Sequence, residues 1–376
     1  MQELSYMTII LGASLIATVI SRRIGVPVVV GQILIGIILT PSMLGVIHGT
    51  HTLEILAEIG VILLMFLAGL ESDFSLLKKH LKPSLLIAIF SVLVPLFVYA
   101  GMTTYIGYQL PVAIFYGLVF SATSVSITVE VLQEYGKLSS RAGAVILGAA
   151  VVDDILAVLV LSFFMSSQET GGNIGLKIVM QVIFLIFLYL AFKWLVTFIF
   201  RFVSKLNIYG KYTTVSLLIC FIFSLLADSV GMSAVIGAFF AGLSIGQTDM
   251  AEKIEASITK ISYVFFIPIF FVTIALPINF SSVFEKPLFL IVLISLAVLS
   301  KFIPSYLVSR GFKFSQQESL LIGSGMVSRG EMALIVAQIG LSSKLIGTSV
   351  YSELVVVIIF STLIAPFLIK MTLDKR

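Results

Sequence analysis

Apolar stretches long enough to cross a bilayer recur from one end of this chain to the other. About 20 consecutive apolar residues form a helix that spans a hydrocarbon core of ~30 Å. Only 11% of the 376 residues are charged, against ~25% in soluble domains. We therefore predict an all-α polytopic membrane protein, which excludes a soluble enzyme, a disordered chain and a secreted disulfide scaffold. The predicted spans are 7–21, 25–41, 53–70, 84–106, 111–133, 142–166, 175–200, 212–228, 230–247, 257–276, 287–309, 318–340 and 350–370.

The basic residues lie almost entirely in alternate loops. With the N-terminus outside, seventeen of the 23 Lys and Arg residues fall in inner loops and the C-terminal tail, and three fall in outer loops. Cytoplasmic loops keep positive charge, so this bias sets the orientation. We expect a multi-pass cell-membrane protein with an outer N-terminus and a cytoplasmic C-terminus. The net charge of +4 follows from the same bias, and nucleic-acid binding has no support.

One pattern of small residues occurs twice along the chain. The segments GVPVVVGQILIG (25–36) and GMSAVIGAFFAG (231–242) carry glycine at the same three positions. Seven predicted spans separate the matching elements, and an odd number inverts one half relative to the other. Inverted repeats with broken helices near the midplane are typical of secondary transporters. We expect one transmembrane unit without a soluble regulatory domain, made of a first repeat (1–166), a linker helix (175–200) and a second repeat (212–376).

A few ionisable residues lie deep inside the predicted spans, where a charge costs several kcal/mol. Adjacent helical residues point ~100° apart, so Asp153 and Asp154 cannot face the same partner. We expect one carboxylate to pair with Lys301 and the other to face a cavity that ions reach, where it holds either a proton or a small cation. The alternative is a set of ion pairs that only fix helix packing. The residues singled out are Asp153, Asp154, Lys301, Arg329 and Glu331, with Lys193 and Asp228 nearer to helix ends.

Two polar interruptions occur at matching places in the two repeats. FSATSVSITVE (120–130) is rich in hydroxyl residues, and GSGMVSRGE (323–331) is rich in glycine and serine. We expect each to break its helix near the centre of the membrane, where the freed backbone groups must be satisfied by protein or a water-filled cavity. Arg329 and Glu331 are expected to offset the dipole ends of the breaks. The sequence contains no P-loop, nucleophile elbow or zinc motif, so ATP, enzymatic activity and a bound cofactor are not expected.

Four segments together resemble the monovalent cation:proton antiporter-2 family, and in particular its bacterial NapA-type sodium/proton antiporters. The resemblance runs over nearly the whole chain, and its most specific part is the Asp-Asp pair with a lysine one repeat later. The potassium efflux members of that family have Gln-Asp in place of Asp-Asp, which weakens a potassium-efflux reading. The segments are FLAGLESD (66–73), ATSVSITVEVLQEYG (122–136), VVDDILAVLVL (151–161) and GSGMVSRGEMALIVA (323–337).

This resemblance implies a thirteen-helix homodimer with a dimer domain and a mobile core domain that moves as an elevator. It places Thr123 and Ser124, as candidate cation-binding residues, in an unwound fifth span. It implies that Asp154 binds the transported cation and the proton, with Asp153 and Ser124 as further candidate ligands of Na⁺. Asp153 corresponds to the partner of Lys301. Arg329 and Glu331 correspond to a charged pair in the second broken helix.

The leading functional prediction is a Na⁺(Li⁺)/H⁺ antiporter that works by alternating access and is electrogenic. K⁺/H⁺ exchange is the close alternative, because nothing in a carboxylate pair sets ion size. A passive cation channel is disfavoured, because two-fold symmetry around buried titratable groups suits alternating access. A symporter for an organic anion would need a roomy apolar pocket and no central lysine. The expected partners are monovalent cations, protons, lipid and a second copy of the chain.

Overall fold

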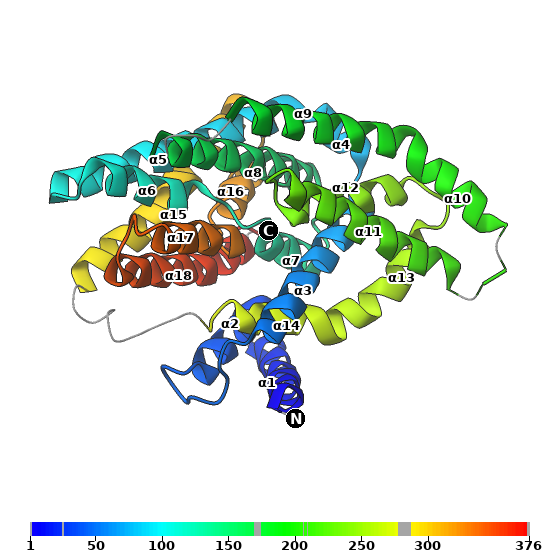
Figure 1. Ribbon diagram of the computed structural model, residues 1–376, viewed down its shortest axis with the longest axis horizontal. Coiled ribbons are helices and arrows are strands. Elements are labelled where there is room, and N and C mark those ends of the chain that lie inside the picture. Colours follow the sequence, from blue (N-terminus) through cyan, green and yellow to red (C-terminus); the bar gives the residue numbers. More distant parts are fainter. Residues whose placement is uncertain are drawn as a thin grey trace. The chain divides into compact units, whose positions relative to one another are not determined.

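The computed structural model describes residues 2–373 except 25, 169–173, 206, 209 and 277–286. Every regular element in the described part of the chain is a helix (Figure 1). Among the described residues, nine helical segments, some of which consist of consecutive helices joined end to end, are long and apolar enough to cross a membrane. Three shorter helices in the described part of the chain are strongly apolar. Each of the thirteen predicted spans coincides with one helix or with consecutive helices. The prediction of an all-helical membrane protein is therefore confirmed.

The chain divides into two compact units. Unit 1 comprises residues 1–54, 77–157 and 271–376, and unit 2 comprises residues 55–76 and 158–270. Neither unit coincides with one of the predicted inverted repeats, whose boundaries stay a prediction. The helices are α1 (Gln2–Ile24), α2 (Val28–Leu39), α3 (His51–Glu71), α4 (Phe74–Lys79), α5 (Leu81–Ile106), α6 (Leu110–Ser121), α7 (Val125–Glu134), α8 (Arg141–Gln168), α9 (Ile174–Leu190), η1 (Ala191–Leu195), α10 (Val196–Ser204), α11 (Lys211–Ser229), α12 (Ala234–Gly246), α13 (Ala251–Ile261), η2 (Ser262–Phe266), α14 (Ile267–Thr273), α15 (Pro287–Gly311), α16 (Gln316–Gly325), α17 (Glu331–Ser342) and α18 (Thr348–Leu373).

Unit 1 contains both predicted helix breaks. α6 ends at Ser121 and α7 begins at Val125, so the hydroxyl-rich segment interrupts its span as expected. α16 ends at Gly325 and α17 begins at Glu331, so the glycine-rich segment does the same. Around these pairs, α5 packs on α6 and α15, and α18 packs on α7, α16 and α17. The two breaks therefore lie inside a bundle of continuous helices.

Small residues let the aspartate-bearing helix approach α5 closely. A methyl group at Gly148 of α8 would meet the hydroxyl of Ser84 on α5 at 2.8 Å. Ser84 in turn donates to the carbonyl of Val145, at 3.1 Å. Close backbone approach of this kind is how membrane helices gain packing contacts. These contacts bring α8 against α5.

Unit 2 is built on a glycine contact between α3 and α12. A side chain at Gly69 would clash with the Phe239 carbonyl, and one at Gly242 would clash with the Phe66 carbonyl. The two backbones thus touch from both sides, as in other small-residue crossings. The predicted linker helix corresponds to α9, η1 and α10, with the π-helical turn η1 in its middle.

Two of the ionisable residues singled out in the spans lie on the surface of unit 2. Lys193 is exposed, and its ammonium group lies 4.7 Å from the ring centroid of Trp194. Asp228 near the end of α11 is exposed as well. A lysine at a membrane surface extends its charge toward the interface. Neither residue belongs to a buried site.

Candidate functional site

The two helix breaks bond directly to each other. The Ser124 amide donates to the Ser328 carbonyl at 2.8 Å, and the Ser328 hydroxyl donates to the Ser124 carbonyl at 2.6 Å. Thr128 on α7 donates to the Gly325 carbonyl at 2.7 Å, at the end of α16. Backbone groups freed by a helix break need such partners at membrane depth. The breaks cross, and each satisfies polar groups of the other.

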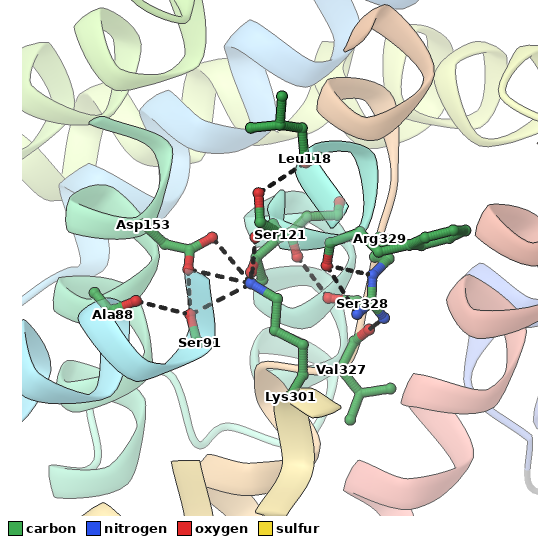
Figure 2. A network of polar contacts seen from close by, with 12 residues as sticks. Ala88, Ser91, Leu118, Ser121, Asp153, Lys301, Val327, Ser328 and Arg329 are labelled. Atoms are coloured by element: carbon green, nitrogen blue, oxygen red, sulfur yellow. Dashed lines mark hydrogen bonds and ion pairs between the residues drawn. The ribbon is translucent and has the colours of Figure 1, made fainter. Parts of the chain in front are cut away.

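Lys301 of α15 occupies the centre of a polar network beside this crossing (Figure 2). Its ammonium nitrogen lies 3.1 Å from Asp153 Oδ1 and 3.3 Å from Oδ2. Both side chains are fully buried. A buried ammonium is tolerated when a carboxylate pairs with it and further oxygens accept its hydrogens. The predicted Asp153–Lys301 pair is therefore present in the structure.

Neutral oxygens complete the surroundings of the ammonium group. Lys301 donates to Thr123 Oγ1 and to the Ser121 carbonyl, each at 2.5 Å. The Ser121 carbonyl belongs to the last turn of α6, where partial negative charge collects. Thr123, predicted as a cation ligand, thus accepts a hydrogen bond from Lys301. Ser124, the other hydroxyl of the break, lies 3.1 Å from the Ser126 hydroxyl.

Ser91 of α5 is a member of this network that the sequence analysis did not find. Its hydroxyl donates to Asp153 Oδ1, and it also accepts a hydrogen bond from Lys301 at 3.3 Å. In Figure 2, Ser91 and Asp153 lie on one side of the Lys301 ammonium group, and the residues of the crossing lie on the other. A signal was available, because Ser84 and Ser91 are seven residues apart and therefore share a helix face. Ser84 and Ser91 both face α8.

Arg329 lies in the second break and is fully buried. Its guanidinium group donates to the carbonyls of Phe120 (3.0 and 3.1 Å), Ala297 (2.5 Å) and Val327 (3.2 Å). Its own carbonyl accepts a hydrogen bond from the Thr362 hydroxyl of α18. Phe120 belongs to the carboxyl end of α6, so Arg329 does offset a helix dipole, as predicted.

Glu331, the predicted partner of Arg329, is the first residue of α17, but its side chain lies outside the described part of the structure. The described contacts of the Arg329 guanidinium group are backbone carbonyls and the face of the Phe120 ring, whose centroid is 5.5 Å away. The charged pair in the second broken helix therefore stays a prediction.

Asp154 follows Asp153 on α8 and is 2% exposed. Because adjacent helical residues point ~100° apart, the Asp154 side chain points in a different direction from the Asp153 side chain, which meets Lys301. Two further buried carboxylates were overlooked among the span residues. They are Glu130 on α7 and Glu353 on α18, both less than a tenth exposed.

These features define a class of protein. Two crossing broken helices, surrounded by continuous membrane-spanning helices and flanked by buried carboxylates and an ammonium group, form the central site of a secondary transporter of small cations. Carboxylates at such a site bind either a proton or a cation, and the site is reached by moving one part of the fold against another.

Comparisons with known proteins agree with this class. Residues 10–375 match the family described as "Sodium/hydrogen exchanger, transmembrane". The chain belongs to this family. It is 43% identical to a Na⁺/H⁺ antiporter of Enterococcus hirae, over 98% of each chain. It is 37% identical to the Na⁺/H⁺-K⁺ antiporter GerN of Bacillus cereus, over 98% of this chain and 95% of the relative.

The fold is shared with a solved sodium/proton antiporter, MjNhaP1 of Methanocaldococcus jannaschii. The two structures superpose with a TM-score of 0.68 over 100% of this chain and 99% of the other, at 17% sequence identity. The resemblance to bacterial sodium/proton antiporters implies this fold, and that prediction is confirmed.

Proposed function

We propose that the protein exchanges Na⁺ or Li⁺ for H⁺ across the cell membrane, driven by the proton gradient. The observation that carries this proposal is the buried Asp153–Lys301 pair directly beside a second buried carboxylate, Asp154. Asp153 is held by Lys301 and Ser91, so Asp154 is the group on which a proton and a cation compete. The exchange activity named for the E. hirae relative supports the same function.

In this proposal the two aspartates have different roles. Asp154 binds Na⁺ or a proton, with Ser124 as a further oxygen ligand. Asp153 holds Lys301 against the carboxyl end of α6, through the Ser121 carbonyl. Thr123 Oγ1 has two lone pairs, and one of them accepts the hydrogen bond from Lys301. A cation on the other lone pair would lie close to the ammonium group, so this hydroxyl couples the binding of Na⁺ to Lys301.

We propose the following transport cycle. The protein alternates between inward-open and outward-open states by an elevator movement, as a homodimer with its N-terminus outside. Lys301 loses its proton when Na⁺ binds nearby, because a second cation disfavours the ammonium form. Together with the proton that Na⁺ displaces from Asp154, this makes two protons exchanged for one Na⁺. Each cycle therefore moves one net charge. Each unit charge is worth about 2.3 kcal/mol per 100 mV of membrane potential.

The primary test is proton movement in proteoliposomes after Na⁺, Li⁺ or K⁺ is added separately. Wild type should move protons with Na⁺ and Li⁺, and Asp154→Asn should abolish the movement while the protein stays folded. The matched control is Asp228→Asn, an exposed aspartate of α11, which should leave transport unchanged. Normal Na⁺-driven proton movement by Asp154→Asn would refute the assignment.

The electrogenic scheme has its own test in the same vesicles. A potassium–valinomycin potential should speed or slow wild-type exchange according to its sign. Lys301→Gln removes the group that supplies one of the two exchanged protons. The variant should therefore exchange one H⁺ for one Na⁺, more slowly and without net charge movement. If the imposed potential does not change the rate of wild-type exchange, the two-proton scheme is wrong, and Lys301 serves only as a structural counter-ion of Asp153.

K⁺ exchange is the second candidate, because the GerN relative is named for both Na⁺ and K⁺. The separate additions of Na⁺ and K⁺ distinguish the two. Proton movement with K⁺ and none with Na⁺ would replace the primary proposal by K⁺/H⁺ exchange at the same aspartates.

A further inference from the structure

A buried carboxylate of unit 1 lies outside the crossing and has no part in the transport cycle described above. Glu353 of α18 is 5% exposed, and its Oε2 accepts a hydrogen bond from the Tyr116 hydroxyl of α6 at 2.8 Å. Tyr116 is fully buried. Both residues belong to membrane-spanning helices. An ionisable residue at such a place is costly, and its presence points to a role in moving ions or protons.

This pair lies near one end of the helix bundle. Tyr116 is six residues from the start of α6 at Leu110, and Glu353 is five residues from the start of α18 at Thr348. The half-buried ring of Tyr108 lies edge-on to the Tyr116 ring, with a centroid distance of 5.4 Å. Tyr108 precedes α6, so it lies between the buried pair and the loop end. The three side chains lead from the surface to a buried carboxyl group.

The same two helices hold Arg329 at the crossing. Phe120, whose carbonyl accepts from Arg329, is one helical turn beyond Tyr116 on α6. Thr362, whose hydroxyl donates to the Arg329 carbonyl, is nine residues beyond Glu353 on α18. At 1.5 Å per residue the distance along α18 is about 14 Å. α6 and α17 also pack together, as do α17 and α18 (Figure 1).

We propose that Glu353 is a second proton-binding carboxylate, which takes up protons from water at the start of α6 and α18 and supplies them to the aspartate site. This proposal rests on the proposed Na⁺/H⁺ exchange. On uptake, an O–H bond forms on Glu353 as a hydronium ion gives up a proton. On delivery, Glu353 returns to the carboxylate and Asp154 becomes a carboxylic acid after its cation leaves. In the proposed orientation the uptake side is the outer face.

The chemistry of the Tyr116–Glu353 bond suits a group that changes its protonation state. A phenol hydroxyl both donates and accepts, so it can donate to the carboxylate and accept from the carboxylic acid. The hydrogen bond therefore survives in both states. Tyr108 is the next titratable group behind Tyr116. A glutamine at position 353 could also accept from Tyr116, so a purely structural bond does not require an ionisable group.

The test uses purified full-length protein with Glu353→Gln and Tyr116→Phe. Tyr105→Phe is the matched control, because Tyr105 is 92% exposed. The first readout is the carboxylic-acid C=O stretching band in infrared difference spectra recorded as the pH is changed without Na⁺. Glu353→Gln should remove one titrating band, and Tyr116→Phe should shift that band because it loses its hydrogen-bond partner.

The second readout is Na⁺-driven proton flux in proteoliposomes as a function of pH. Glu353→Gln should lower the flux most at alkaline pH, where protons are scarce. The alkaline limb should move to lower pH, because the carboxyl group proposed to collect protons is gone. The half-saturating Na⁺ concentration should stay within about twofold of wild type, because Asp154 is unchanged.

The outcomes separate this proposal from the proposed function. If wild type moves no protons with Na⁺, Li⁺ or K⁺, the exchange function fails, but the infrared band still reports whether Glu353 titrates. If wild type exchanges and Glu353→Gln has the wild-type spectrum and pH profile, the Glu353 proposal is wrong. If Glu353→Gln does not fold, Tyr116→Phe decides, because an unshifted band and unchanged profile would overturn the proposal.

Discussion

Removing Lys301 and Asp153 singly and together tests the centre of the site most directly. Lys301→Met leaves the Asp153 carboxylate buried with the Ser91 hydroxyl as its described donor. Asp153→Asn leaves the ammonium buried on the neutral oxygens of Thr123 and Ser121. Breaking one half of a buried ion pair costs about 3–5 kcal/mol, because the remaining charge is uncompensated.

A physical ceiling limits the cost of the lysine variant. An isolated buried carboxylate takes up a proton instead of remaining charged. With an ordinary aspartate pKa of ~3.9, this protonation costs about 4 kcal/mol at pH 7 and about 1.5 kcal/mol at pH 5. Lys301→Met should therefore lose less stability as the pH falls. The double variant Asp153→Asn/Lys301→Met has no buried charge at these positions and should recover at least about 2 kcal/mol relative to either single variant.

The assay is unfolding by sodium dodecyl sulfate in mixed micelles, followed by far-ultraviolet circular dichroism at pH 7 and pH 5. The four proteins form a double-mutant cycle, which isolates the interaction between the two side chains. Lys193→Met is the control, because Lys193 is exposed in unit 2, and it should change stability by less than about 0.5 kcal/mol. A coupling energy below about 0.5 kcal/mol at pH 7 would refute the buried pair.

Three further predictions concern the first helix break, the bond between the two breaks, and His80. Thr123→Ala and Ser124→Ala should raise the half-saturating Na⁺ concentration more than they lower the maximal rate of proton flux; an unchanged value in both would mean that these hydroxyls only brace the break. Ser328→Ala loses its bond to the Ser124 carbonyl and should cost about 1–3 kcal/mol in detergent unfolding, because a buried acceptor loses its donor. Burial and the nearby Arg141 lower the pKa of His80 at the start of α5, so the folded state resists protonation. Stability should fall as the pH drops below 6.5, the ordinary histidine value, and His80→Gln should fall less over that range.

The membrane helices and the paired breaks were predictable because their causes are local. Apolar length decides where a helix crosses the bilayer. Clusters of serine, threonine and glycine decide where it is interrupted, as at 122–124 and 326–330. The pairing of Lys301 with one of the two aspartates was predictable for a different reason, and the family resemblance indicated that the partner is Asp153. A lysine at that depth needs a carboxylate, and the sequence offers few at a similar depth.

The remaining contacts depend on helix packing, which one sequence does not reveal. Ser91 lies in an ordinary apolar span, and its role follows from the approach of α5 to α8 at Gly148. Arg329 was expected to pair with Glu331, but its described partners are carbonyls, which carry no side-chain signal. Glu353 was overlooked because it lies near the start of its span, where a charged residue is usual. Its burial comes from contacts with other helices.

In the proposed exchange, the two basic residues set the charge balance of the site. Lys301 and Arg329 both donate to carbonyls at the carboxyl end of α6, those of Ser121 and Phe120. Their two positive charges balance ionised Asp153 and Asp154, so these four side chains sum to zero. A proton or a Na⁺ at Asp154 raises the sum to one, and both at once would raise it to two in a buried region, where each uncompensated charge is costly. The loss of a proton from Lys301 restores neutrality when Na⁺ is bound. On this proposal, charge balance makes a proton and Na⁺ compete at Asp154, and the release of a proton by Lys301 is the step that couples Na⁺ binding to transport.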